Sequence, residues 1–137
     1  MSEMKLKSTP LEINPAPWTA ERLRSFGAAW RRGDVEELMS YMTDDCSYSA
    51  SVGPEPGATY IGREAVRRGF EELLKYDAKA QGRGGRVFIA GEIGVAEWSF
   101  IYTDEAGHET EVKGVDLFEF DGDKIRRKDA YRKTKAV

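Results

Sequence analysis

Apolar residues in the first half of the chain recur with the period of an α-helix. Leu23, Phe26 and Trp30 follow one another at helical spacing. Thr19 before them and Gly33 after them are residue types that begin and end helices. Two more apolar stripes predict two more helices, the first of which begins with Asp34 in a capping-box pattern. The residues expected to be buried in these two helices are Leu38, Met39 and Met42, and then Ala65, Val66, Phe70, Leu73 and Leu74.

The second half of the chain alternates between apolar and polar residues, as β-strands do. Long strands are predicted at about 86–90, 95–103, 109–120 and 125–133, and a short strand at 46–52 lies between the second and third helices. A run of helices followed by a run of strands indicates an α+β fold. In such a fold the helices cover one face of an antiparallel sheet.

A central hairpin fixes which residues of this sheet share a face. A three-residue loop at 105–107 pairs Ala96 with Asp116, and it pairs Trp98 with Gly114, where the missing side chain leaves room for the indole. The face that carries Trp98 is strongly aromatic and is expected to lie against the helices. Its other aromatic residues are Phe100, Tyr102, Phe118, Phe120 and Tyr131.

The last hairpin carries the candidate chemistry. Regular alternation outward from the turn at 121–124 pairs Asp116 with Asp129 and Phe118 with Arg127. Two carboxylates that face each other in apolar surroundings cannot both ionise at low cost, and this is how an acid or base near neutral pH is made. An Arg–carboxylate cluster with a purely structural role is the alternative. A single β-bulge would turn Asp129 to the other face.

Composition narrows the function classes. The 137 residues are 40% apolar and 33% charged, which fits one soluble domain at 18–137 after an extended, proline-containing arm at 1–17. The net charge of −3 and the lack of a basic stripe or a long apolar run argue against nucleic-acid and membrane partners. One cysteine and one histidine leave no Cys/His zinc site, and no metal or cofactor is expected. No apolar leader is seen, and a cytoplasmic location is expected.

Four segments follow one another in a recognisable order and spacing. They are Phe26–Met39, Asp44–Cys46, Tyr60–Val66 and Gly114–Ile125. Together they resemble the NTF2-like superfamily, and within it the SnoaL-like and ketosteroid-isomerase-like branch. The resemblance covers about residues 18–133. It implies a cone in which a curved antiparallel sheet wraps around three helices and encloses a pocket, and it implies homodimers through the sheet. Such proteins include isomerases, polyketide cyclases, dehydratases, epoxide hydrolases and non-catalytic binding modules.

The resemblance can be followed residue by residue. Ketosteroid isomerases use a tyrosine and an aspartate at positions that hold Phe26 and Ala50 here, so steroid isomerisation by those groups is not expected. Their third residue, a protonated aspartate, matches Asp116. The Asp-Arg-Asp set of limonene-epoxide-hydrolase-like relatives is matched in residue type by Asp116, Arg127 and Asp129, although the strand positions differ. Polyketide-cyclase-like relatives need chiefly one aspartate as acid and base, which this chain meets most easily.

The sequence therefore predicts a small-molecule pocket and an enzyme that moves a proton next to the carbonyl of an apolar compound. Cyclisation, isomerisation and dehydration are reactions of this kind. Asp116, Asp129 and Arg127 are the candidate catalytic residues. The candidate ligand-binding residues are Phe26, Trp30, Tyr48, Tyr60, Trp98, Phe100, Tyr102, Phe118 and Tyr131. A non-catalytic module for a hydrophobic ligand and a dimerising interaction domain are the alternatives.

Overall fold

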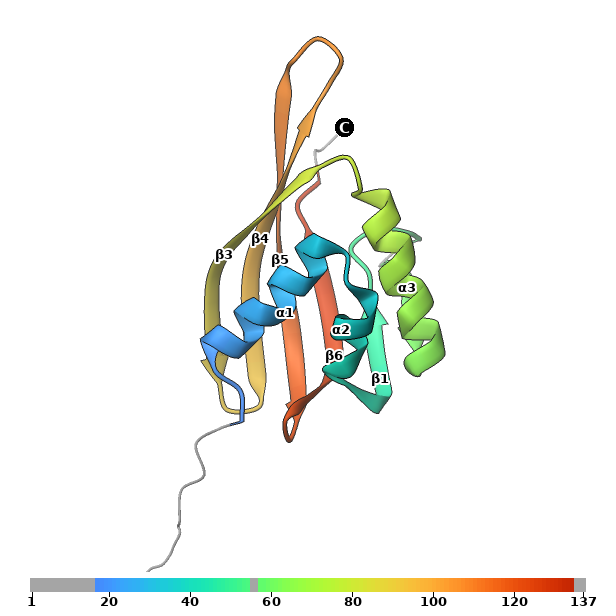
Figure 1. Cartoon of the computed structure of the whole chain (residues 1–137), viewed down its shortest axis with the longest axis vertical. Helices are drawn as coiled ribbons and strands as arrows, with labels where there is room; N and C mark the ends of the chain where they lie inside the picture. Colours follow the sequence, from blue (N-terminus) through green and yellow to red (C-terminus); the bar gives the residue numbers. More distant parts are fainter. Residues whose placement is uncertain (1–16, 55–56, 135–137) are drawn as a thin grey trace, which may run out of the picture.

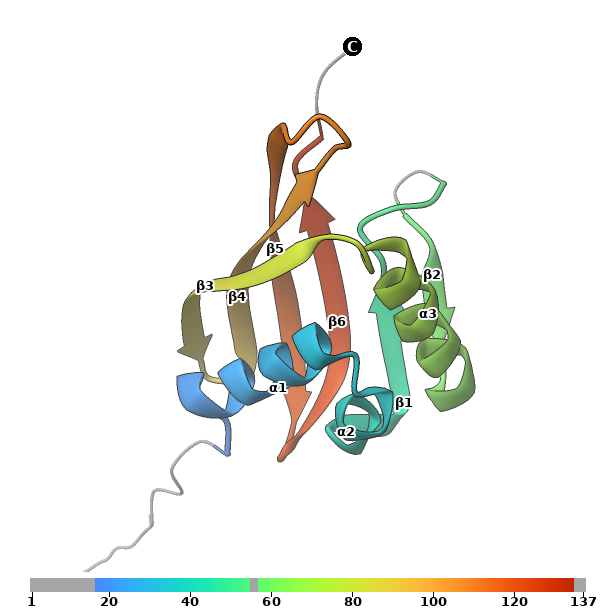
Figure 2. The ribbon, with the colours of Figure 1, turned by 45° about the horizontal axis from the view of Figure 1, so that its top comes forward.

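A curved sheet wraps around the helices and forms a cone (Figure 1, Figure 2). The computed structural model describes residues 17–54 and 57–134, so the predicted arm lies almost wholly outside the described residues. In chain order the elements are α1 (Ala20–Arg32), α2 (Val35–Ser40), β1 (Met42–Ser49), β2 (Thr59–Ile61), α3 (Arg63–Tyr76), β3 (Gln81–Ala90), β4 (Ile93–Thr103), β5 (Glu109–Asp121) and β6 (Lys124–Arg132). The predicted α+β cone is confirmed.

The helix boundaries follow from local hydrogen bonds. The Thr19 hydroxyl accepts a hydrogen bond from the Arg22 backbone N–H at 3.1 Å and begins α1. Gly33 ends α1 in the left-handed conformation, with φ 72°. The Asp34 carboxylate then accepts from the Glu37 backbone N–H at 3.1 Å and begins α2. The two predicted caps are therefore confirmed.

The six strands lie in the order β2-β1-β6-β5-β4-β3. All neighbouring pairs are antiparallel except β1 and β6, which run parallel. The alternation of apolar and polar residues along a strand shows which face of the sheet each residue occupies. It does not show the direction of a neighbouring strand from a distant part of the chain, so the sequence did not predict this parallel pair. The β4–β5 hairpin extends beyond the cone at the top of Figure 1.

The central hairpin has the predicted register. Ala96 pairs with Asp116, and Trp98 pairs with Gly114. A Cβ atom at Gly114 would lie 2.3 Å from the Trp98 ring, so only glycine lets the indole cross this strand. The turn at 105–107 closes as expected, because the Asp104 N–H donates to the His108 carbonyl at 2.9 Å.

The predicted register of the last hairpin is wrong beyond its first pairs. Phe120 pairs with Ile125 as expected, but the next pair joins Glu119 to Arg127, which leaves Arg126 as the extra residue of a β-bulge. One extra residue turns every later side chain of β6 to the opposite face. Asp116 therefore lies beside Ala130, and the predicted pairing with Asp129 does not occur.

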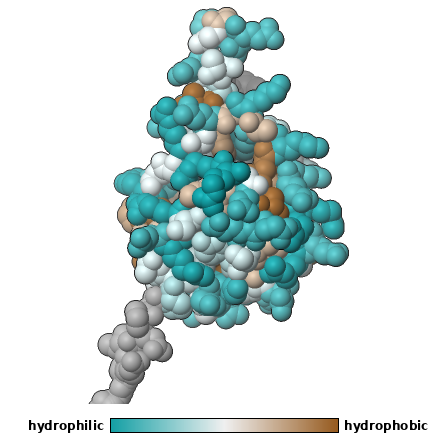
Figure 3. All heavy atoms as spheres, in the orientation of Figure 1, coloured by the Kyte–Doolittle hydropathy of each residue, from teal (hydrophilic) through white to brown (hydrophobic). Residues whose placement is uncertain are grey.

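The core lies between the helices and the concave face of the sheet. Phe26, Tyr48, Phe70 and Phe118 are almost fully buried there, and their rings make edge-to-face contacts with neighbouring rings. The helical side seen in Figure 3 carries mainly hydrophilic residues. Within the part of the chain that the structure describes, none of the helices has the length and apolar character needed to cross a membrane.

Candidate functional site

A cavity of about 290 Å³ opens into the cone between α1 and the concave face of the sheet. Its walls are largely apolar and include aromatic rings, which suits the flat apolar body of a small molecule. Six of the predicted ligand-binding residues line it: Phe26, Trp30, Tyr48, Trp98, Phe100 and Phe118. They come from α1, β1, β4 and β5, so one wall is helical and the other belongs to the sheet.

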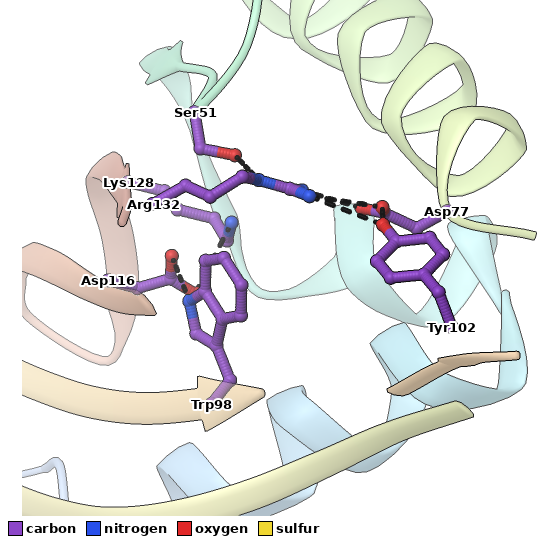
Figure 4. A network of polar contacts seen from close by, with 7 residues as sticks. All are labelled: Ser51, Asp77, Trp98, Tyr102, Asp116, Lys128 and Arg132. Atoms are coloured by element: carbon purple, nitrogen blue, oxygen red, sulfur yellow. Dashed lines mark hydrogen bonds and ion pairs between the residues drawn. The ribbon is translucent and has the colours of Figure 1, made fainter. Parts of the chain in front are cut away.

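Asp116 is the carboxylate of this cavity. It lies on β5 with 13% of its side chain exposed, and the Trp98 indole N–H donates to its Oδ1 at 3.0 Å. Its Oδ2 lies 3.4 Å from the Nζ of Lys128 on β6 (Figure 4). The neutral indole donor and the ammonium thus fix the orientation of the carboxylate within the cavity.

Lys128 is a buried cation, with 4% of its side chain exposed. Its Nζ lies 4.2 Å from the centre of the Trp30 ring and 4.7 Å from the centre of the Tyr48 ring, at distances where the ring faces attract a cation. Burial lowers the pKa of the Lys128 ammonium, and the nearby Asp116 carboxylate opposes this effect. Burial, followed by the Asp116 charge, raises the pKa of the Tyr48 phenol well above its ordinary value.

A second polar cluster borders the cavity at the end of α3. The Arg132 Nη2 donates to Asp77 Oδ2 at 2.8 Å, and its Nε donates to the Ser51 hydroxyl at 3.1 Å. The Tyr102 hydroxyl donates to the other oxygen of Asp77. Figure 4 shows this guanidinium spanning the space between Ser51 and Asp77. Arg132 and Asp77 are 8% and 5% exposed, so the pair is buried.

The structure separates several predicted site residues from the cavity. Arg127, Asp129 and Tyr131 lie on the outer face of the sheet, because Asp129 pairs with the half-exposed Leu117. There the Asp129 carboxylate accepts hydrogen bonds from Arg127 at 3.0 Å and from the Tyr131 hydroxyl at 3.2 Å. The expected placement of Asp129 and Arg127 beside Asp116 is wrong, and the bulge is the physical reason.

Two further predicted ligand-binding residues lie outside the cavity lining. Tyr102 belongs to the Asp77 cluster. Tyr60 stacks on Tyr48 with 5.9 Å between ring centres, and its hydroxyl donates to Glu72 at 3.4 Å. Its ring also fills the space above Gly69, where a Cβ would lie 2.6 Å from it. Tyr60 therefore packs α3 against β2.

Sequence reasoning missed Lys128, because regular alternation from the turn at 121–124 places Arg127 and Asp129 on the inner face and Lys128 on the outer face. One signal could have found it. Ile125 and Ala130 are five residues apart, so regular alternation would place them on opposite faces. Both are apolar, so they can share the core face only if a bulge lies between them, as the structure has it. The same bulge brings Lys128 to the inside.

Metal ligation is not supported by the described residues. Within residues 17–54 and 57–134, no three or more His, Cys, Asp or Glu side chains are grouped to hold an ion. Cys46 is buried, and burial raises the pKa of its thiol, which disfavours the thiolate that a metal or an electrophile requires.

Comparison with known proteins identifies the domain family and finds solved structures with the same fold. Residues 23–128 match the SnoaL-like domain family. No curated protein matches the chain. An NTF2-like protein of unknown function from Cytophaga hutchinsonii is 19% identical, with a TM-score of 0.67 over 85% of this chain and 100% of that one. TerC, crystallised with polyporic acid, is 16% identical, with a TM-score of 0.67 over 82% and 89%.

An enzyme with a described reaction type has the same fold. The epoxide hydrolase/cyclase-like enzyme SalBIII, described in pyran ring formation in the polyether salinomycin, is 18% identical. Its TM-score is 0.66 over 83% of this chain and 89% of that one. At these identities the likeness concerns the fold, and the chemistry has to be argued from the residues of the cavity.

Proposed function

The chain belongs to the SnoaL-like domain family, and from that premise we propose that it is an enzyme that transfers a proton next to the carbonyl group of an apolar small molecule. The observation that carries the proposal is Asp116, held between the Trp98 indole and the Lys128 ammonium inside an aromatic cavity. A carboxylate in a largely apolar cavity costs desolvation energy and adds nothing to the packing of the core. Its place there therefore supports a chemical role.

Asp116 acts as the base in this proposal. Its Oδ1 accepts the indole N–H, and its Oδ2 faces Lys128. The carboxylate removes a proton from the carbon next to the carbonyl. The electron pair of that C–H bond forms the C=C bond of the enolate, and the carbonyl π electrons move to oxygen. The proton then returns from Asp116 to the same carbon or to another one.

Lys128 stabilises the enolate in this proposal. Its ammonium lies against two ring faces and one carboxylate, in a space with little water, where a fixed positive charge interacts strongly with a developing oxyanion. Trp98 positions the carboxylate and leaves one oxygen for the proton. Cyclisation, isomerisation and dehydration all pass through such an enolate, so the choice among them depends on the substrate.

The experiment measures proton exchange and needs no knowledge of the natural substrate. β-Tetralone, an apolar ketone with acidic protons, is incubated in D₂O with the protein, and loss of its α-proton signals is followed by NMR. We expect wild-type protein to accelerate exchange, and Asp116→Asn to lose about 100-fold or more of this acceleration, because a general base contributes 10²–10⁴-fold.

The matched control is Asp129→Asn, which removes a carboxylate from the outer face of the same sheet. It should leave exchange unchanged. Equal loss in both variants, or exchange by wild type no faster than by buffer, would contradict the enzyme proposal. Binding of β-tetralone without exchange would favour the non-catalytic binding module.

Two further parts of the proposal concern assembly and location. The outer face of the sheet exposes five large apolar residues, with Ile61 75%, Phe88 52%, Ile93 44%, Leu117 38% and Tyr131 54% exposed. An apolar surface of this kind is typical of a protein–protein contact, and a second copy of the chain, sheet against sheet, is the proposed partner. A cytoplasmic location remains a proposal that rests on the sequence.

A further inference from the structure

The opening of the cavity between α1 and β3 carries arginine side chains. Arg24 and Arg31 are seven residues apart on α1, so they lie on one helical face, and both line the cavity. Both are also exposed to solvent. An exposed residue that lines a cavity marks where the cavity opens, so these two guanidinium groups flank its entrance.

The Arg31 side chain lies against three glycines, and this contact surface is called the glycine seat of Arg31. A Cβ at Gly82 would lie 3.3 Å from the Arg31 Cγ, and a Cβ at Gly84 would lie 3.2 Å from its Nη1. On the helical side, a Cβ at Gly27 would lie 3.5 Å from the same nitrogen. The arginine side chain therefore extends from α1 along the backbone of β3, in space that any larger residue would narrow. Figure 2 shows β3 running beside α1 at this position.

The charges deeper in the cavity are already paired. Asp116 contacts Lys128, and Asp77 contacts Arg132. The remaining acid of the lining, Glu97, pairs with Arg86 at 2.7 Å, and this hydrogen bond lowers the pKa of Glu97 to about 2. With the described residues Arg24 and Arg31 form no ion pair, in a chain whose net charge is −3. The entrance is therefore a local site of positive charge.

We propose that Arg31, assisted by Arg24, binds a carboxylate group of the ligand at the entrance of the cavity. The inference rests on the proposed function and specifies its substrate class, an apolar carbonyl compound that also bears a carboxylate. The apolar body lies among the aromatic residues and the carbonyl is directed toward Asp116. A guanidinium can hold a carboxylate by two parallel hydrogen bonds, and this contact fixes orientation as well as affinity.

The test compares a carboxylate probe with its methyl ester, which carries no charge. Acetylnaphthoate and its methyl ester are titrated into wild-type protein by calorimetry, with tryptophan fluorescence as a second readout because Trp30 and Trp98 line the cavity. We expect the acid to bind roughly tenfold more tightly than the ester, the ratio given by one charge-assisted hydrogen bond of about 1.4 kcal/mol. Arg31→Gln should remove this difference and leave ester affinity unchanged.

Arg32→Gln is the matched control, because Arg32 is the next residue on α1 and pairs with Glu37 at 2.6 Å. It should preserve the preference for the acid. Gly84→Val places a side chain against the Arg31 guanidinium and should weaken binding of the acid more than binding of the ester.

Three outcomes would overturn the inference. Equal affinity for acid and ester in wild type overturns the carboxylate site alone and leaves the cavity as a ligand site. If the Arg31→Gln variant still prefers the acid, a group other than Arg31 binds the carboxylate. Binding of neither probe overturns the substrate class, whereas the role of Asp116 is judged separately by exchange on β-tetralone, which has no carboxylate.

Discussion

Lys128 experiences opposing influences whose balance sets its chemistry. Burial disfavours the ammonium, whereas the Asp116 carboxylate and the faces of Trp30 and Tyr48 favour it. The net effect lowers the pKa of Lys128 below its ordinary 10.5. The proposed mechanism needs the ammonium, because a neutral amine has no charge with which to stabilise an enolate.

The pH dependence of proton exchange follows from this shift. We expect exchange on β-tetralone to slow as the pH rises through the lowered pKa of Lys128, well before 10.5. Lys128→Arg should remove this alkaline decline, because a guanidinium stays charged over the whole range. The measurement is a pH–rate profile for both proteins. Lys124→Arg, a change on the same strand at a lysine that contacts the Ser40 carbonyl, is the control and should keep the decline.

The same shift affects stability. Between the lowered pKa and 10.5 the unfolded chain binds a proton at Lys128 that the native protein does not bind. The free energy of unfolding should therefore rise with pH across this window, and Lys128→Met should remove that rise.

At the scale of elements, the buried Arg132–Asp77 pair joins parts of the chain that are distant in sequence. Arg132 ends β6, Asp77 follows α3, and Tyr102 and Ser51 bring β4 and the segment after β1 to the same point. Removal of one partner from a buried ion pair leaves an uncompensated charge, which costs far more than the intact pair gains. The pair thus holds the α3 end of the cavity in place.

Asp77→Ala should lower the free energy of unfolding by about 3–5 kcal/mol in urea titrations. Glu36→Gln, which breaks the exposed Arg67–Glu36 pair at 2.6 Å, is the matched control and should cost less than about 1 kcal/mol. Similar small losses in both variants would show that Arg132 is solvated in the native protein.

At the scale of the whole molecule, the two faces of the sheet have different surroundings. The concave face is covered by helices and holds the cavity, while the outer face exposes Leu117 and its apolar neighbours to solvent. Because residues alternate between these faces along each strand, a change on one face can leave the other intact. Assembly and ligand binding should therefore be separable by mutation.

Leu117→Glu should convert the proposed dimer into a monomer in analytical ultracentrifugation, because two buried carboxylates would face each other across a sheet-to-sheet contact. Its affinity for acetylnaphthoate should stay within about twofold of wild type. Tyr76→Glu is the control and should keep the dimer, since Tyr76 is 61% exposed on α3 and lies off the outer face of the sheet. A dimer that persists in Leu117→Glu would contradict the proposed contact.

Local chemistry in the sequence determined the elements of this protein and much of its fold. The Thr19 and Asp34 caps, the left-handed Gly33 and the contact between Trp98 and Gly114 each depend on residues close together in the chain or in one hairpin, and each was predictable. Asp116 was also placed correctly on the aromatic face, because the central hairpin is regular from its turn to this residue.

Only the tertiary structure decided what surrounds Asp116. The bulge at Arg126 is selected by the burial of both Ile125 and Ala130, which depends on the helices and on β1, far away in the sequence. It replaced Asp129 with Lys128 and so exchanged a carboxylate pair for an ion pair. The Arg132–Asp77 pair and the glycine seat of Arg31 likewise join distant segments. Alternation along a strand is a local rule, whereas the presence of an extra, bulged residue in a strand pair depends on the packing of the whole core.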